Sequence, residues 1–356
     1  MALMIISPSI RVAAVAFAGA ATLHAMCPTS AAERGNPVQR FQLERFVIGG
    51  SGGWDFLTFD SVGNRLFVTR GERVQVWDVA TRAVAGEIVD TPGVHGVALA
   101  HELNRGFTSN GRANSVSVFR LDDLKTLTTI AIAGENPDAI LYAPVVKRVY
   151  TFNGRSHDVT VIDAVTLTVV ATVALGGKPE VAVADDTGHL FVNLEDTAEI
   201  AVIDQATHRI QARWPLKPCL EPTGLAIDVS HQRLFAVCAN HKMVIVDATS
   251  GRLVGDVLIG AEPDGVEFDP ASNQAFSANG EGTVTVVQES DPEHFATVAT
   301  LATQAHARTL ALDLVSHRIY LVTASFGPTP AATSAQPRPR PPMLADTFNV
   351  LVLTPR

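Results

Sequence analysis

The chain has 356 residues, of which 47% are hydrophobic, and its formal net charge is −9 at pH 7. This length and hydrophobic content allow either one large core or two domains. The acidic balance repels phosphate backbones, so it argues against general nucleic-acid binding.

The N-terminal segment has the pattern of a secretory signal. Arg11 precedes an apolar run over residues 12–23, and the small residues 29–32 close the segment. This pattern predicts a signal peptide over residues 1–32, cleaved after Ala32, and therefore a periplasmic or secreted protein. The apolar run is shorter than the roughly 20 residues that a membrane-spanning helix needs, so we expect no transmembrane span.

The rest of the sequence is built from a repeat. An aromatic residue recurs at intervals of 40, 43, 41, 44, 41 and 44 residues. The recurring residues are Phe67, Phe107, Tyr150, Phe191, Phe235, Phe276 and Tyr320. Around each aromatic residue lie short β-branched runs with alternating apolar residues, such as 181–184 and 200–204, which are typical of strands. Four strands in each unit of this length predict the blades of a β-propeller, and seven units predict seven blades.

The two ends of the sequence predict that the repeat closes into a ring. Residues 348–353 supply a third strand to the last unit, and residues 41–48 form an unassigned strand before the first unit. Pairing these two segments completes the last blade and hides a free sheet edge. The predicted fold is all-β, a single seven-bladed propeller domain over residues 33–356 with four-stranded blades, closed by the N-terminal strand.

The repeats resemble those of exported YncE-like propellers, which are built from YVTN-type repeats. The resemblance rests on forms such as Thr160-Val161-Ile162-Asp163 followed by Thr166, and on Gly176-Gly177-Lys178-Pro179. It covers nearly the whole chain after the signal segment. It implies a seven-bladed propeller in an exported location, but no single activity, because propellers serve many functions.

Aspartates recur between the third and fourth strands, each with a threonine three residues later. The pairs are Asp78 with Thr81, Asp163 with Thr166, and Asp204 with Thr207. A repeated turn needs the same chemistry in every blade, so we predict that each carboxylate bonds nearby backbone N–H groups. An array of carboxylates for a metal is the alternative.

A second set of polar residues lies just before the inner strands, where the connections surround one mouth of the central channel. One aligned position holds Asp55, His95, Asp138, Glu180, Thr223, Asp264 and Arg308. Glu221 and His306 lie two places earlier in their units, and Asn153 and Asn240 follow second strands, whose ends reach the same face. Such residues commonly form turns, but converging oxygens also bind a divalent cation or a small polar ligand.

Two cysteines remain after the signal segment, Cys219 and Cys238. They flank the predicted inner and second strands of blade five, and antiparallel pairing of these strands brings both cysteines toward the same face. Because exported proteins oxidise thiols within reach, we predict a disulfide, with a pair of free thiols as the alternative.

A proline-rich segment over residues 327–345 interrupts the last unit between its second and third strands. It carries Arg338 and Arg340 between prolines. Such a composition forms a solvated spacer. The alternative is a semi-rigid flap whose arginines reach the carboxylates of the channel mouth.

These features predict a non-catalytic binding or scaffolding propeller of the bacterial cell envelope that uses its acidic channel mouth. The expected partner is a small polar ligand or an envelope protein, a divalent cation is a possible cofactor, and the expected state is a monomer. Two alternatives stay open. One is a calcium-dependent, lactonase-like hydrolase, and the other is an accessory subunit of a periplasmic redox protein.

Overall fold

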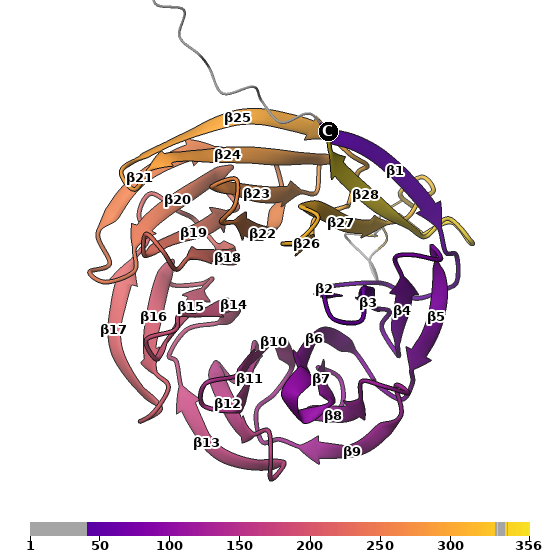
Figure 1. Cartoon of the computed structure of the whole chain (residues 1–356), viewed down its shortest axis with the longest axis horizontal. Helices are drawn as coiled ribbons and strands as arrows, with labels where there is room; N and C mark the ends of the chain where they lie inside the picture. Colours follow the sequence, from indigo (N-terminus) through magenta and orange to yellow (C-terminus); the bar gives the residue numbers. More distant parts are fainter. Residues whose placement is uncertain (1–40, 332, 334–338, 340) are drawn as a thin grey trace, which may run out of the picture. The chain divides into compact units, whose positions relative to one another are not determined.

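The computed structural model describes residues 41–331, 333, 339 and 341–356, and the predicted signal segment lies outside this range. The described residues form seven sheets, each of four antiparallel strands, arranged as blades in a ring (Figure 1). This confirms the predicted all-β, seven-bladed propeller. Within the described residues, no helix has both the length and the hydrophobicity that a bilayer span requires.

Blades 1 to 6 use their strands in chain order from the centre of the ring outward, and blade 7 takes its outermost strand from the start of the chain. Blade 1 contains β2 (Leu57–Asp60), β3 (Arg65–Thr69), β4 (Val74–Asp78) and β5 (Ala83–Ile88). Blade 2 contains β6 (Val94–Ala100), the 3-10 helix η1 (His101–Leu103), β7 (Arg105–Asn110), β8 (Ser115–Arg120) and β9 (Thr126–Ala131). Blade 3 contains β10 (Pro137–Ala143), β11 (Arg148–Asn153), β12 (Asp158–Asp163) and β13 (Thr168–Ala174).

The remaining blades repeat this arrangement. Blade 4 contains β14 (Pro179–Ala184), β15 (His189–Leu194), β16 (Glu199–Asp204) and β17 (Arg209–Pro215). Blade 5 contains β18 (Pro222–Asp228), β19 (Arg233–Cys238), β20 (Lys242–Asp247) and β21 (Leu253–Leu258). Blade 6 contains β22 (Pro263–Asp269), β23 (Gln274–Asn279), β24 (Thr283–Asp291) and β25 (His294–Ala302). Blade 7 contains β26 (Leu310–Asp313), β27 (Arg318–Thr323), β28 (Asn349–Pro355) and β1 (Phe41–Val47).

The recurring aromatic residues form the core between the blades. Each of the seven lies on the second strand of its blade and is at most 1% exposed. Some contact aromatic residues of the next blade, as Phe235 does with Phe268, whose ring centroid lies 5.0 Å away. Burial of each such side chain contributes about 1.5–3 kcal/mol to folding, so the repeated aromatic position accounts for the repeated packing.

The aspartates between third and fourth strands cap turns, as predicted. Asp78 Oδ1 accepts hydrogen bonds from the backbone N–H and the hydroxyl of Thr81, at 2.6 and 2.8 Å. The backbone N–H groups of Thr166 and Thr207 donate to Asp163 and Asp204 in the same way. These hydrogen bonds lower the pKa of all three aspartates. The carboxylates therefore stabilise turns.

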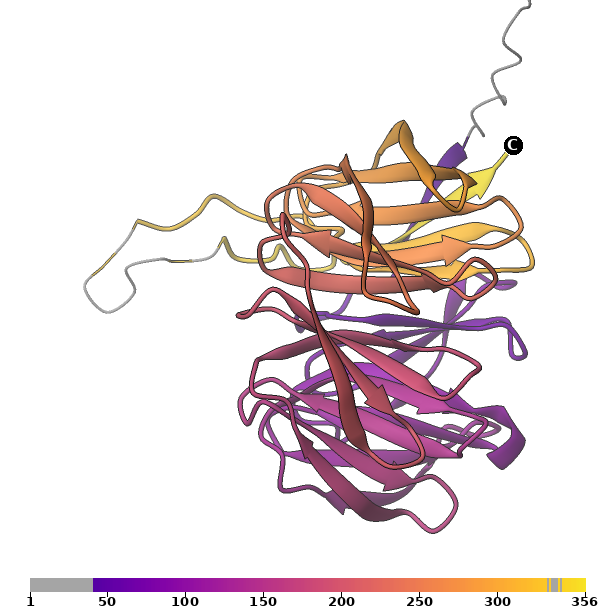
Figure 2. The ribbon, with the colours of Figure 1, turned by 90° about the vertical axis from the view of Figure 1, so that its left-hand side faces the viewer.

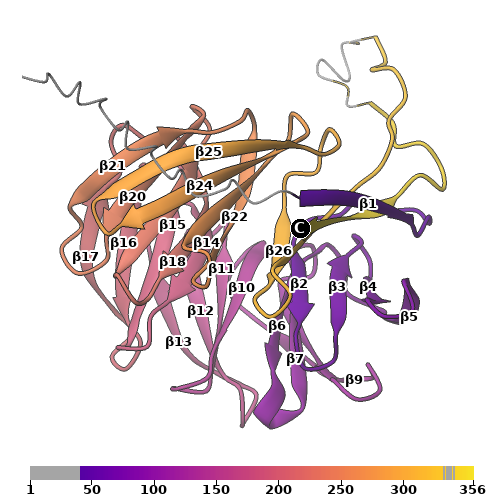
Figure 3. The same cartoon turned by 45° about the horizontal axis from the view of Figure 1, so that its top comes forward.

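The N-terminal strand closes the ring, as predicted. β1 pairs with β28 in an antiparallel register that runs from Phe41 opposite Pro355 to Val47 opposite Asn349 (Figure 1). Phe46 of β1 lies 5.6 Å from Trp77 of blade 1, measured between ring centroids. The inner strands β26 and β2 lie side by side at the same junction (Figure 3). Blade 7 thus combines three strands from the C-terminal end of the chain with one strand from the N-terminal end.

The connection between β27 and β28 projects from the ring (Figure 2). Its base continues the two strands through a bridge between Phe326 and Met343 and a 2.8 Å hydrogen bond from the backbone N–H of Gly327 to the carbonyl of Pro342. Arg338 and Arg340 fall outside the described residues. The spacer and flap interpretations of this segment both remain predictions.

Cys219 and Cys238 form a disulfide that ties the start of blade 5 to the end of β19. The bond closes a loop with a sequence separation of 19 residues, which by loop entropy contributes about 3 kcal/mol to the free energy of unfolding. We expect reduction to lower the urea midpoint correspondingly. A variant with both cysteines replaced by alanine should show no dependence on reductant. Equal midpoints for the oxidised and reduced protein would contradict this expectation.

Candidate functional site

Local irregularities in the inner strands position the polar residues of the channel mouth. The first residues of β6, β10, β14, β18 and β22 each contain a register shift. The residues within these shifts include His95, Asp138, Glu180, Thr223 and Asp264. A bulge bends its strand and changes the direction of a side chain. The repeated bulge therefore sets the orientation of the aligned polar position.

Hydrogen bonds between neighbouring blades hold these positions in place. The backbone N–H of Phe56 donates to the carbonyl of His95 at 3.1 Å, which links blades 1 and 2. The Thr309 hydroxyl donates to the carbonyl of Asp55 at 2.8 Å, which links blades 7 and 1. These links fix the backbone on both sides of Asp55 relative to the neighbouring blades.

His95 of blade 2 joins two carboxylates, one from blade 1 and one from blade 3. Its Nδ1 lies 2.6 Å from Asp55 Oδ2 and 3.5 Å from Asp138 Oδ1, and all three side chains are 21–26% exposed. Burial lowers the pKa of His95, but the hydrogen bond with Asp55 and the charge of Asp138 outweigh it, so the pKa is raised. Burial also raises the pKa of Asp138 to about 6, although the charge of His95 opposes the shift.

Blade 4 adds two carboxylates that share one ammonium group. Lys178 Nζ donates to Glu180 Oε1 at 2.7 Å and also to Glu195. Burial, with the charges of Asp138 and Glu195, raises the pKa of Glu180, although the hydrogen bond and charge of Lys178 oppose the shift. Glu180 is 15% exposed, so its ionised form is poorly solvated.

Blades 6 and 7 contribute the pair of Asp264 and Arg308. Arg308 Nε lies 3.1 Å from Asp264 Oδ2, with the arginine side chain 55% exposed and the aspartate 18% exposed. Burial raises the pKa of Asp264 to about 7 despite the charge of Arg308, and Asp55 and Asp138 add to the shift. The carboxylates of the mouth therefore outnumber its fixed cations, Lys178 and Arg308.

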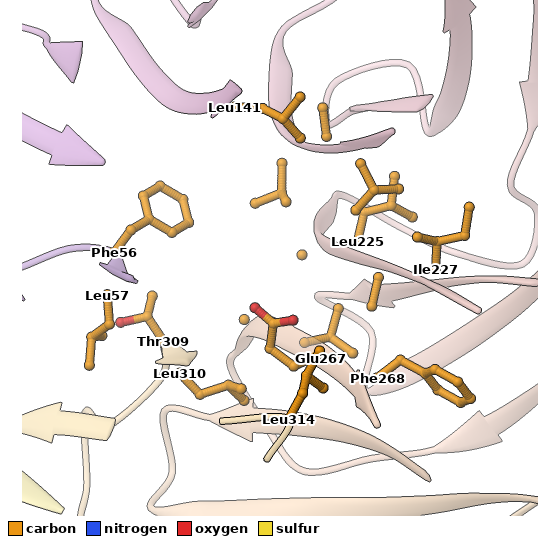
Figure 4. Close-up of a pocket in the computed structure, with 17 residues that line it drawn as sticks. Phe56, Leu57, Leu141, Leu225, Ile227, Glu267, Phe268, Thr309, Leu310 and Leu314 are labelled. Carbon is orange, nitrogen blue, oxygen red and sulfur yellow. The ribbon is translucent and has the colours of Figure 1, made fainter. Parts of the chain in front are cut away.

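The mouth leads into an apolar cavity of about 410 Å³ in the central channel. Its walls include Phe56, Leu225 and Phe268, and the carboxylate of Glu267 points into it (Figure 4). The side chain of Glu267 is open to the channel, but the protein around it raises its pKa to about 7 by desolvation. A cavity of this size, mostly apolar with few polar groups, is typical of a small-molecule site.

The side chains of four other predicted site residues are not joined to this cluster by any contact seen among the described residues. Asn153 is fully buried, and its side-chain amide donates to Asp158 and Thr160, so it stabilises its own blade. Asn240 is bonded to the backbone of Leu220 and Pro218. The ring of His306 packs against Phe326, with centroids 4.7 Å apart, and Glu221 is exposed with a φ of 47°.

Sequence reasoning did not include Glu195 or Glu267 in the site. Glu267 had a detectable signal, because it lies opposite Phe276 in the strand register, and the equivalent position in every other blade is uncharged. The corresponding residues are Thr58, Ala98, Leu141, Val183, Ala226 and Ala311. Glu195 gave no such signal, because exposed carboxylates are common after strands.

The similarity of this chain to known proteins is a similarity of fold. No protein-family model matches the sequence, and no curated protein matches it. The hydrazine synthase of Kuenenia stuttgartiensis has a similar structure, with a TM-score of 0.67 at 17% identity over 77% of this chain and 94% of that chain. A chain of the mitotic checkpoint complex has a TM-score of 0.71 at 12% identity over 97% of this chain and 99% of that chain.

Proposed function

We propose that this protein is a non-catalytic binding propeller of the bacterial cell envelope, and that its channel mouth binds a small organic cation. The observation that carries the proposal is the gathering of carboxylates with raised pKa values at the opening of an apolar cavity. Glu180, Asp264 and Glu267 hold protons wholly or partly at neutral pH because burial disfavours their ionised forms.

A ligand with a positive charge stabilises the ionised forms of these carboxylates. An ammonium group placed among the carboxylates favours their ionised forms and replaces the protons that they otherwise hold. The apolar cavity walls suit a hydrocarbon body attached to the charged group. The expected ligand is therefore an amine with an apolar portion small enough for the channel.

The location in the envelope is supported by the sequence. The segment 1–32 has the pattern of an export signal, and the repeats resemble those of exported YncE-like propellers. The disulfide between Cys219 and Cys238 fits an oxidising compartment. The lactonase-like alternative receives less support, because it needs amide oxygens at the mouth and Asn153 is directed into its blade.

A panel matched in size and different in charge tests the proposal. Benzylamine, benzyl alcohol and benzoate are added separately to the purified protein, and thermal unfolding is followed. We expect benzylamine to raise the midpoint, benzyl alcohol to have a small effect, and benzoate to have none. A response to benzoate but not to benzylamine would contradict the proposal. A response to CaCl2 alone would identify the mouth as a metal site instead.

A further inference from the structure

A second group of titratable side chains lies at the end of the ring opposite the channel mouth. Asp228 is the last residue of β18, and His231 lies in the turn that leads to β19. Glu289 lies near the end of β24 in the next blade. Antiparallel blades place the ends of their first and third strands on the same face, so the three residues meet between blades 5 and 6.

The side-chain atoms of this cluster converge on His231. Its Nδ1 lies 2.7 Å from Asp228 Oδ2 and 2.9 Å from Glu289 Oε1. The carboxylates are almost fully buried, with side-chain exposures of 1% each, whereas the His231 side chain is 36% exposed. One ligand atom from each residue lies within 4.8 Å of the other two.

These converging atoms are unsatisfied despite their burial. Although Nδ1 lies 2.7 and 2.9 Å from two of these oxygens, His231 Nδ1, Asp228 Oδ2 and both carboxylate oxygens of Glu289 make no well-directed hydrogen bond within the described part of the chain. In contrast, Asp228 Oδ1 accepts two hydrogen bonds from Ser230 and caps the turn. Buried polar atoms without partners are costly and rare in folded proteins, so the cluster lacks a bonding partner.

A single proton on the imidazole does not satisfy all of these atoms. Histidine carries at most one hydrogen on Nδ1, so it cannot donate well to two carboxylates. The nearby guanidinium of Arg233 is bonded to Asp247 and Glu293. Burial, followed by the charge of Asp228, raises the pKa of Glu289 to about 7, as expected for a carboxylate without sufficient compensation.

We propose that Asp228, His231 and Glu289 bind a divalent first-row transition-metal cation, with Zn²⁺ as the representative ion. One imidazole nitrogen and two carboxylate oxygens are a common ligand set for Zn²⁺, whereas Ca²⁺ and Mg²⁺ prefer oxygen alone. Ligand atoms about 2.1 Å from one ion lie about 3 Å from each other, so a small opening of the cluster admits the ion. The bound ion links two blades.

A neighbouring turn provides a matched control. His317 Nδ1 lies 2.9 Å from Asp269 Oδ2, and this contact also joins residues of adjacent blades. Within the described residues, this pair is not part of any group of three potential ligands. His317→Gln therefore removes a comparable histidine without removing a proposed ligand.

The experiment uses the tag-free, chelator-treated protein carrying Asp138→Asn, which reduces metal binding at the channel mouth. ZnCl2 is titrated by calorimetry, and thermal unfolding is measured with and without Zn²⁺. We expect about one bound equivalent and a higher unfolding midpoint. Because outer-shell changes alone weaken metal sites about 10–100-fold, we expect Glu289→Gln to weaken binding at least 100-fold and His317→Gln less than about twofold.

Two further measurements keep the outcome decisive. Glu289→Gln removes a buried charge without changing the shape of the side chain, so the metal-free variant should be at least as stable as its parent. If Glu289→Gln fails to fold, His231→Gln replaces it in the Zn²⁺ titration, because His231 is partly exposed. Co²⁺ added to the parent should give a visible absorption band that His231→Gln abolishes. Absence of Zn²⁺ binding in the parent, or equal affinity in these variants, would overturn the proposal.

Discussion

Neutralising the four carboxylates with raised pKa values, by Asp138→Asn, Glu180→Gln, Asp264→Asn and Glu267→Gln, is expected to weaken binding of a cationic ligand about 1,000-fold. Each carboxylate contributes about 1 kcal/mol of attraction in this partly desolvated site, and about 4 kcal/mol corresponds to that factor. The measurement is a calorimetric titration with benzylamine at pH 8, where Asp138, Asp264 and Glu267 are mostly ionised in the native protein.

The same variant should remain folded. A carboxyl group whose pKa is raised by folding favours the native state below its unfolded pKa, and this contribution is lost as the pH rises through the folded value. The amide side chains of the variant do not ionise, so the variant does not lose this stability as the pH rises. The ligand-free variant should therefore be at least as stable as the parent at pH 8. As a control, Asp122→Asn and Asp186→Asn change acidic residues in turns on the opposite face and should alter affinity less than about twofold. Unchanged affinity in the neutralised variant would exclude these carboxylates as the ligand site.

Deleting β1 is expected to lower the free energy of unfolding by about 5 kcal/mol or more. The deletion removes the half-buried side chains of Phe41, Leu43 and Phe46 together with the hydrogen bonds to β28. It also leaves β28 as a free edge strand, which promotes aggregation. Chemical unfolding, with light scattering to detect aggregates, measures both effects.

A circular permutant provides the control for this deletion. Because Phe41 lies opposite Pro355, a short turn can join residue 355 to residue 41, so that all four strands of blade 7 become continuous in the sequence. New termini between residues 48 and 53 keep every strand intact. We expect this permutant to recover most of the lost stability. If the deletion variant were as stable as the parent, closure by β1 would not stabilise the ring.

The features predicted from the sequence were those that depend on local chemistry repeated in every unit. The spacing from Phe67 to Tyr320 indicated seven blades because each aromatic residue fills the same place between blades. The pairing of Asp78 with Thr81 indicated a turn because both partners lie within three residues. The mouth position was identified from the alignment of the same units.

The features that the sequence did not reveal depend on contacts between blades. The contacts of His95 with Asp55 and Asp138 require the bulges that orient these side chains, and no residue pattern marked those bulges. Asn153 was expected at the mouth, but its hydrogen bonds direct it inward. Glu289 approaches His231 only because blades 5 and 6 are adjacent, so the sequence of either blade alone does not indicate the cluster.

Proton release on ligand binding tests the central claim most directly. A cation that binds the carboxylates must displace the protons that Asp264 and Glu267, with pKa values of about 7, partly hold at neutral pH. Calorimetric titration of benzylamine at pH 7, in buffers of different ionisation enthalpy, counts these protons. The account predicts release of at least one proton per ligand at pH 7, less release at pH 8, and weaker binding as the pH falls below 6. Binding without proton release at pH 7, or with proton uptake, would contradict it.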